Sequence, residues 1–253
     1  MLCDESIVKK RVIIIYSEQM KVEIGSRKPI VAIGDVHGLD NWKSIVEMHQ
    51  ECKIVFLGDY LDPYVSVNRK KLIANLYDII NLKRSRPDDV ILLLGNHDMH
   101  YFCEDIAMGT RFDYVISGEV SRMFIENNDL FQYAYQAGNR IFTHAGISQE
   151  WWDDDFHGDI SMPIDEQLNH PSEAQMPALC RVGELRGGWH GALGGIFWAD
   201  RRELVNPLHG FTQIVGHNRV ADILEYKGEH DNKIVFCDCL WQGKYLHIEA
   251  EEQ

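Results

Sequence analysis

The sequence predicts an α/β fold in which helices cover a sheet of largely parallel strands. Three short runs, at 29–34, 53–58 and 90–94, are almost unbroken apolar sequence, as expected for strands that are buried on both faces. Between them, 42–49 and 69–84 carry apolar residues at three- and four-residue spacing, which is typical of helices that bury one side. This alternation favours parallel strands joined by helical crossovers.

The pattern changes from Phe131 onward. Residues 131–136 alternate in polarity, Gly138-Asn139 is typical of a turn, and 140–143 resembles a returning strand. Further strands are expected at 213–215, 223–226, 233–238 and 245–249. We expect the strands of this C-terminal third to form a second, mainly antiparallel sheet.

Residues 151–195 separate the two halves. This stretch is rich in Asp, Pro, Gly, His and Trp and has weak periodicity, and so long an irregular segment inside a compact domain is usually functional. No Pro/Gly/Ser-rich linker divides the chain. We therefore interpret residues 1–253 as a single domain in which 151–195 is an irregular lid or rim beside the site.

The charge balance restricts the class of partner. The 253 residues contain 25 Lys and Arg against 39 Asp and Glu, a formal net charge of -14. This balance argues against a protein that coats nucleic acid polymers, because phosphate neutralisation needs clustered cations. It is compatible with a small phosphorylated substrate, since bound metal ions reverse the local field of an acidic site.

The sequence also predicts a cytoplasmic protein without a membrane span. The longest early apolar run, Val12 to Tyr16, is too short to cross a bilayer, and the first residues lack the pattern of a secretory signal. Six scattered cysteines fit reduced thiols better than a disulfide framework. His49 and His247 are among the histidines expected to be ordinary surface or core residues.

Five polar motifs follow apolar runs in a fixed order. They are GDVHG at 34–38, GDYLD at 58–62, GNHD at 95–98, THAG at 143–146 and GHN at 216–218. Ligand sites in sheets of parallel strands form beyond the carboxyl ends of the strands. The first three motifs are therefore expected to converge in space.

The motifs supply carboxylate, imidazole and amide ligands, a mixture that suits a pair of hard-to-borderline divalent metal ions. The candidate ligands are Asp35, His37, Asp59, Asn96, His144 and His217. They divide into Asp35, His37 and Asp59 on one ion and Asp59, Asn96, His144 and His217 on the other, with Asp59 as the bridge. Positions left open for water and substrate indicate a catalytic rather than a structural site.

These motifs resemble those of the calcineurin-like metallophosphoesterases, above all the phosphoprotein-phosphatase branch and its bacterial relatives that cleave diadenosine tetraphosphate. The resemblance runs from about Ile30 to His217, and Phe197-Trp198-Ala199-Asp200 is similar to the Trp-Ser-Asp segment of that branch. It implies a four-layer α-β-β-α sandwich with two central mixed β-sheets flanked by helices. It also implies two divalent ions, manganese first, with iron, zinc, nickel or magnesium as alternatives.

The resemblance further implies the catalytic roles. His97 would protonate the leaving oxygen, and Asp62 would hold the imidazole in the right tautomer and raise its proton affinity. A hydroxide bridging the two metal ions would attack phosphorus in line.

The chain departs from the family pattern after Asp62. Where the family places a phosphate-gripping Arg, this sequence has Pro63 and then Tyr64. Arg201 is the candidate substitute for substrate binding. The competing candidates are Arg69, Arg111 and Arg186.

The leading hypothesis is a metal-dependent phosphatase acting on phosphomonoesters, either phosphoprotein Ser/Thr or a small phosphorylated metabolite. The missing Arg motivates an alternative, hydrolysis of a dinucleoside polyphosphate anhydride or a cyclic-nucleotide phosphodiester. A third hypothesis, a non-catalytic scaffold, is weakened because no ligand of the set is lacking. The sequence predicts neither the physiological substrate nor the oligomeric state.

Overall fold

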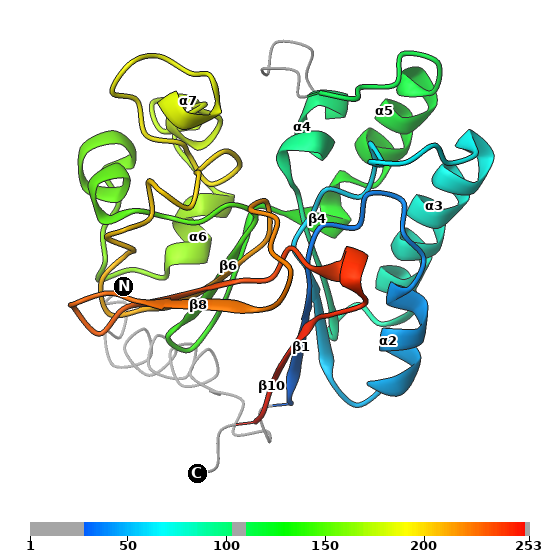
Figure 1. The fold of residues 1–253 in the computed structure, drawn as a ribbon, viewed down its shortest axis with the longest axis horizontal. Coiled ribbons are helices and arrows are strands. Elements are labelled where there is room, and N and C mark those ends of the chain that lie inside the picture. The colour runs from blue at the N-terminus through cyan, green and yellow to red at the C-terminus, as the bar shows by residue number, and fades with distance from the viewer. Residues whose placement is uncertain (1–27, 103–109, 251–253) are drawn as a thin grey trace, which may run out of the picture.

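Two β-sheets lie in the middle of the molecule, and helices cover the outer side of each (Figure 1). The structure, a computed structural model, describes residues 28–102 and 110–250, so the early apolar run at 12–16 lies outside the described residues. The architecture confirms the predicted four-layer sandwich of two mixed sheets. No helix in the described parts of the chain is long and apolar enough to cross a membrane.

The first sheet contains the three predicted parallel strands. Its order is β10-β1-β2-β3-β4, in which β1 to β4 run parallel and β10 pairs antiparallel with β1. The strands are β1 (Ile30–Ile33), β2 (Lys53–Phe56), β3 (Val90–Leu93), β4 (Phe131–Gln132) and β10 (Leu246–Ile248). The outer face is covered by α2 (Trp42–Met48), α3 (Arg69–Ser85) and α5 (Ser117–Glu126) (Figure 1).

The second sheet has the order β5-β6-β7-β9-β8. Its strands are β5 (Ala134–Ala137), β6 (Arg140–Thr143), β7 (Thr212–Val215), β8 (Leu224–Lys227) and β9 (Lys233–Phe236). The expectation of a mainly antiparallel sheet is wrong, because β6, β7 and β9 are parallel. Long connections, such as 144–211 between β6 and β7, permit parallel pairing. The strand expected at 245–249 is β10 and belongs to the first sheet.

An apolar layer joins the two sheets. Side chains from the inner face of the first sheet, including Val55 and Leu93, pack against Phe142, Ile214 and Val235 of the second. These residues are buried, and burial of apolar surface is the main force that holds such layers together. The sheet-to-sheet contact fixes the relative position of the strand ends that carry the motifs.

Residues 151–195 contain short helices: a π-helix (Trp151–Phe156), α6 (Ile164–Asn169), α7 (Met176–Leu179) and a 3-10 turn (Glu184–Arg186). The side chains of Trp151, Trp152 and Phe156 are fully buried, and Asp165 of α6 accepts a hydrogen bond from the backbone of Gln136 in β5. This part of the segment forms the outer layer over the second sheet. Its role as a lid stays a prediction.

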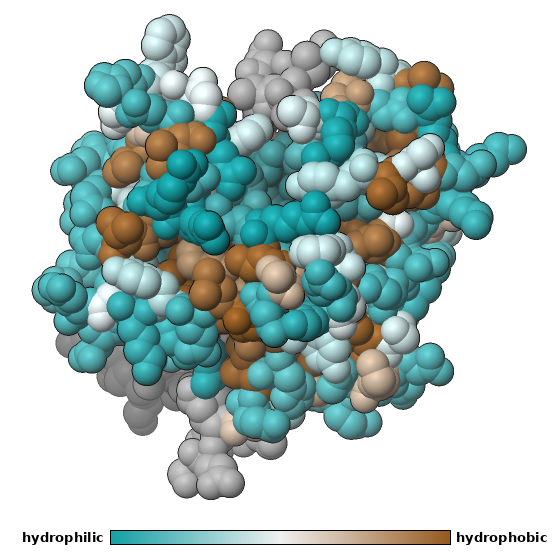
Figure 2. Space-filling model, in the orientation of Figure 1, coloured by the Kyte–Doolittle hydropathy of each residue, from teal (hydrophilic) through white to brown (hydrophobic). Residues whose placement is uncertain are grey.

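The face seen in Figure 2 is mostly hydrophilic, with apolar residues in patches near its middle. This surface agrees with the acidic, charge-rich composition.

Candidate metal centre

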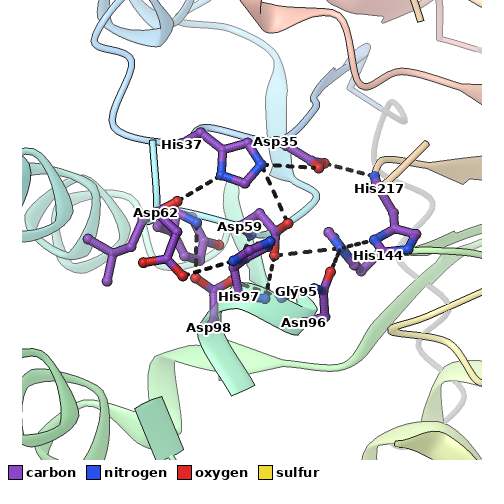
Figure 3. A network of polar contacts seen from close by, with 12 residues as sticks. Asp35, His37, Asp59, Asp62, Gly95, Asn96, His97, Asp98, His144 and His217 are labelled. Carbon is purple, nitrogen blue, oxygen red and sulfur yellow. Dashed lines mark hydrogen bonds and ion pairs between the residues drawn. The ribbon is translucent and has the colours of Figure 1, made fainter. Parts of the chain in front are cut away.

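The five motifs converge at the carboxyl ends of strands from both sheets (Figure 3). Asp35 and His37 follow β1, Asp59 follows β2, and Asn96 begins α4 (Asn96–Phe102) after β3. His144 follows β6, and His217 comes two residues after β7. The six side chains are brought together as the sequence predicted, although their roles as metal ligands remain proposals.

Asp35, His37 and Asp59 form the first donor cluster, whose ligand atoms lie within 4.8 Å of one another. His37 Nδ1 lies 2.7 Å from the carbonyl oxygen of Leu61 and can donate to it. This leaves Nε2 facing Asp35 Oδ2 at 3.8 Å and Asp59 Oδ2 at 3.6 Å. An imidazole whose other nitrogen is held by a carbonyl is the usual arrangement of a metal-binding histidine.

The second donor cluster contains Asp59, His144 and His217. His144 Nδ1 lies 2.7 Å from the Leu57 carbonyl oxygen. Its Nε2 faces Asn96 Oδ1 at 3.0 Å, His217 Nδ1 at 3.2 Å and Asp59 Oδ1 at 3.6 Å. His144 therefore presents a lone pair to a point on which the other donors also converge.

Asp59 belongs to both clusters and presents Oδ2 to one and Oδ1 to the other. Its backbone is left-handed, with φ 53°, as are those of His37, Asp62 and His217. Such conformations cost free energy in non-glycine residues and gather at functional sites. Gly95 packs so tightly here that a Cβ would collide with Asp59 Oδ1.

Burial shifts the pKa values of the donor side chains toward their neutral forms. Burial, together with neighbouring carboxylates, raises the pKa of Asp35 and of Asp59 well above the usual range. Burial lowers the pKa of His37 and of His144 to about 3, so both imidazoles are neutral lone-pair donors. His217 Nε2 is buried without a hydrogen-bond partner among the described residues. Buried carboxylates beside neutral imidazoles fit divalent cations.

His97 lies beside the clusters and is paired with Asp62. His97 Nδ1 lies 2.8 Å from Asp62 Oδ2, His100 Nε2 lies 2.8 Å from the same oxygen, and the Tyr101 hydroxyl donates to Oδ1 at 2.7 Å. Burial alone would raise the pKa of Asp62, but hydrogen bonds from these three residues hold it below its usual value. The carboxylate therefore stays ionised and orients His97.

Asp62 raises the proton affinity of His97, as expected from the sequence, but other groups in the site lower it. Burial lowers the pKa of His97, and the nearby Arg111 guanidinium lowers it further, which together outweigh the opposing effect of Asp62. Arg111 Nη2 lies 3.2 Å from His97 Nε2, and its Nε donates to the Asp62 carbonyl oxygen at 2.9 Å. Its guanidinium carbon lies 3.7 Å from the centre of the Tyr64 ring.

The other arginines considered from the sequence do not contact His97, although Arg186 Nη2 donates to Asn218 Oδ1 of the fifth motif at 2.7 Å. The side chain of Arg201 is exposed, and its backbone N–H donates to Asn218 Oδ1 at 2.9 Å. Arg69 pairs with Asp113 and Arg186 with Asp200. Among the four candidates, Arg111 is the one with a described contact to His97.

Two buried carboxylates of the site were missed by sequence reasoning. Asp98, the last residue of the third motif, accepts hydrogen bonds from the backbone N–H groups of Asp59, Tyr60 and Gly95 at 2.7 to 2.9 Å. Asp98 thereby joins the loop after β2, which carries Asp59, to the loop after β3. Asp238 lies two residues after β9, its negative charge helps to raise the pKa of Asp35, and burial raises its own pKa to about 6. Its position after a strand was the signal that could have identified it.

Comparison with known proteins places the chain in a family. The profile of the calcineurin-like phosphoesterases matches residues 28–226. The chain belongs to this family. It is therefore a metal-dependent phosphoesterase, and the buried Asp and His clusters are consistent with its divalent metal centre.

Solved structures support the same fold. A cold-active protein-tyrosine phosphatase from a Shewanella species is 19% identical, with a TM-score of 0.52 over 88% of this chain and 75% of that one. A protein serine/threonine phosphatase from Saccharomyces cerevisiae is 15% identical, with a TM-score of 0.51 over 91% of this chain and 82% of that one. A search of curated protein sequences found no match.

Proposed function

We propose that this phosphoesterase hydrolyses phosphomonoesters, on phosphoprotein Ser/Thr or a small phosphorylated metabolite, by in-line attack of water at phosphorus. The observation that carries the proposal is the position of Asp59, which faces both donor clusters while the His97–Asp62 pair lies beside them. Two bound divalent ions would supply an acidified water and neutralise charge on the phosphoryl oxygens. Manganese is the first ion to test, because this mixture of donors accepts several first-row metals.

The chain's own residues would position the ester. Asp62 orients His97 through Nδ1, so that Nε2, once protonated, can donate to the leaving oxygen. Arg111 points its guanidinium at the same edge of His97, where it can bind a phosphoryl oxygen. An open hollow of about 760 Å³ adjoins this point, lined by residues 62–70 together with Arg111 and Asp113, and has room for the rest of a substrate.

The test is the initial rate of phosphate release from p-nitrophenyl phosphate by metal-stripped protein, with and without added manganese. Metal-dependent turnover supports the proposal, and it should be followed by phosphoserine and phosphothreonine peptides and by alkyl phosphates. Turnover of the aryl ester alone would contradict the proposed substrate class, because His97 would then be unnecessary for the leaving group.

A second candidate is hydrolysis of a nucleotide anhydride or diester, and the rim of the site favours it. Tyr64 lies edge-on to His37, with ring centres 4.8 Å apart. The Arg219 guanidinium carbon lies 4.6 Å from the Tyr64 ring and 4.2 Å from the Trp241 ring. Exposed aromatic rings with interleaved guanidinium groups suit a base and more than one phosphate. Faster cleavage of a diadenosine polyphosphate than of a phosphopeptide would favour this candidate.

We keep the cytoplasm as the proposed compartment. The support is the scattered spacing of the six cysteines, which does not resemble a disulfide framework.

A further inference from the structure

A second group of metal-ligand side chains lies at the opposite end of the first sheet from the phosphoesterase centre. His49 caps the C-terminus of α2, Cys52 directly precedes β2, and His247 lies in β10. Each strand residue advances about 3.3 Å, so the four residues of β2 keep this group more than about 13 Å from the loop that carries Asp59. The group therefore shares no ligand with the centre described above.

The sheet register brings the three residues to one face. His247 pairs with Val31, and Val31 pairs with Ile54. Residues opposite one another in a sheet point to the same side, as do residues two apart along one strand. Cys52 and His247 therefore lie on the helix-covered side, where α2 ends with His49.

The donor atoms converge on a common point. Cys52 Sγ lies 4.0 Å from His49 Nδ1 and 3.8 Å from His247 Nε2, and all three donors lie within 4.8 Å of one another. In a tetrahedral zinc site, metal–ligand lengths of about 2.3 Å for sulfur and about 2.0 Å for nitrogen place sulfur and nitrogen about 3.5 Å apart. A contraction of roughly half an ångström brings the sulfur–nitrogen distances to that value.

Both imidazoles are oriented through their other nitrogen. His49 Nε2 lies 2.8 Å from the Tyr245 hydroxyl, and His247 Nδ1 lies 3.3 Å from Glu249 Oε1. Donation from these far nitrogens leaves a lone pair on the nitrogen that faces Cys52. Metal-binding histidines are held in the same way by a carboxylate or another oxygen.

In the tautomers that donate from both far nitrogens, hydrogen bonding alone leaves this arrangement incomplete. A thiol has one proton and can donate it to only one imidazole, so in the oriented tautomers the other lone pair faces sulfur with nothing between them. A cysteine nucleophile is also disfavoured, because burial, with a smaller contribution from Glu249, raises the pKa of the Cys52 thiol. A cation bound by all three donors satisfies them together.

We propose that His49, Cys52 and His247 form a separate binding site for a thiophilic divalent ion of the zinc class. Thiolate with two imidazoles is a donor set that selects zinc over magnesium or calcium. Cys52 is buried, whereas the His247 side chain is 31% exposed, so an ion can enter from solvent and keep a water as its fourth ligand. The bound ion would tie the edge strand β10 to the connection between α2 and β2.

Cobalt(II) distinguishes this site from the phosphoesterase centre, whose proposed ligands include no sulfur. The full-length protein is stripped of metal under reducing conditions and titrated with cobalt(II), and the thiolate-to-cobalt charge-transfer absorption is followed in the near ultraviolet. The expected result is a saturable band that zinc abolishes by displacement. The band should be lost in Cys52→Ser and retained in the matched control Cys180→Ser, which changes a cysteine outside the group.

A second variant covers the case in which Cys52→Ser fails to fold. His247→Gln changes a partly exposed residue of the edge strand and should weaken apparent cobalt affinity by at least about tenfold. The proposal is overturned if the wild-type protein gives no thiolate band at saturating cobalt. It is overturned equally if the band persists in folded Cys52→Ser or is unaffected by His247→Gln.

Discussion

Replacing Asp62 with Asn isolates the contribution of the carboxylate that orients His97. In the structure this carboxylate is 1% exposed and contacts His97, His100 and Tyr101 at 2.7 to 2.8 Å. Asn keeps one acceptor oxygen and replaces the other with a donor, so at least one of the three contacts is lost. The contacts that remain are then made to a neutral amide and no longer to a charged carboxylate.

The size of the effect follows from the bond to His97. A hydrogen bond to a charged group contributes about 1.5–3 kcal/mol, which corresponds to a fall of roughly 10- to 150-fold in kcat if that bond is what keeps His97 oriented and protonated before it gives up its proton. His97→Ala removes the general acid itself and should lower kcat by about 10²–10⁴-fold. Both losses should appear with an alkyl phosphate and be much smaller with p-nitrophenyl phosphate, whose leaving group barely needs a proton.

The assay is steady-state phosphate release from both esters by the manganese-loaded protein and its variants. Asp62→Asn should add no further loss in a His97→Ala background, because Asp62 acts through His97. Tyr101→Phe is the matched control, since it removes one contact to Asp62 and leaves the contact to His97. Equal losses of Asp62→Asn on both esters, or an additive loss in the double variant, would refute this reasoning.

Three further predictions concern metal binding and the substrate. Asp59→Asn should abolish activity and metal binding in both donor clusters, as measured by bound metal after dialysis; retention of both ions would contradict the bridging assignment. Arg111→Gln should lower kcat/KM by roughly 10- to 150-fold through loss of a charged hydrogen bond to phosphate, and a larger loss in Arg201→Gln would instead favour Arg201. Because burial raises the pKa of Asp35 and Asp238 adds to this effect, protons compete with the metal, so apparent manganese affinity should rise with pH. Calorimetry in buffers of different ionisation enthalpy should show proton release that decreases in Asp238→Asn; affinity independent of pH would contradict this.

The first half of the fold could be predicted because its strands carry a local signal. The runs at 30–33, 53–56 and 90–93 are apolar on both faces, which is typical of parallel strands between layers. The second sheet was harder to predict. Its short strands alternate with turns, and nothing local shows that β7 pairs with β6 and β9 in parallel. Strand order in that sheet depends on long connections that periodicity does not describe.

In the site, too, residues in local motifs could be predicted from the sequence, whereas contacts between distant segments could not. The convergence of the candidate ligands could be predicted because each follows a strand in a short motif with a recognisable donor. Arg111 could not be chosen over Arg201, because it belongs to no motif and its contact with His97 is made only in the tertiary structure. His49 and His247 were expected to have no function, since they are 198 positions apart in the sequence and only the pairing of β10 with β1 brings them close. Residues that meet only in the tertiary structure have no characteristic spacing in the sequence by which they could be recognised.

The metal centre straddles the boundary between the two sheets, and this has a consequence for how the enzyme can be tuned. One sheet supplies Asp35, Asp59 and Asn96, and the other supplies His144 and His217. The apolar layer between the sheets therefore acts as a spacer whose thickness sets the distance between the two sets of donors. Side chains in that layer are not among the proposed ligands, yet a change of one methyl group there would alter the gap that an ion must fill. Metal preference in this enzyme can thus evolve through the hydrophobic core while every ligand stays the same.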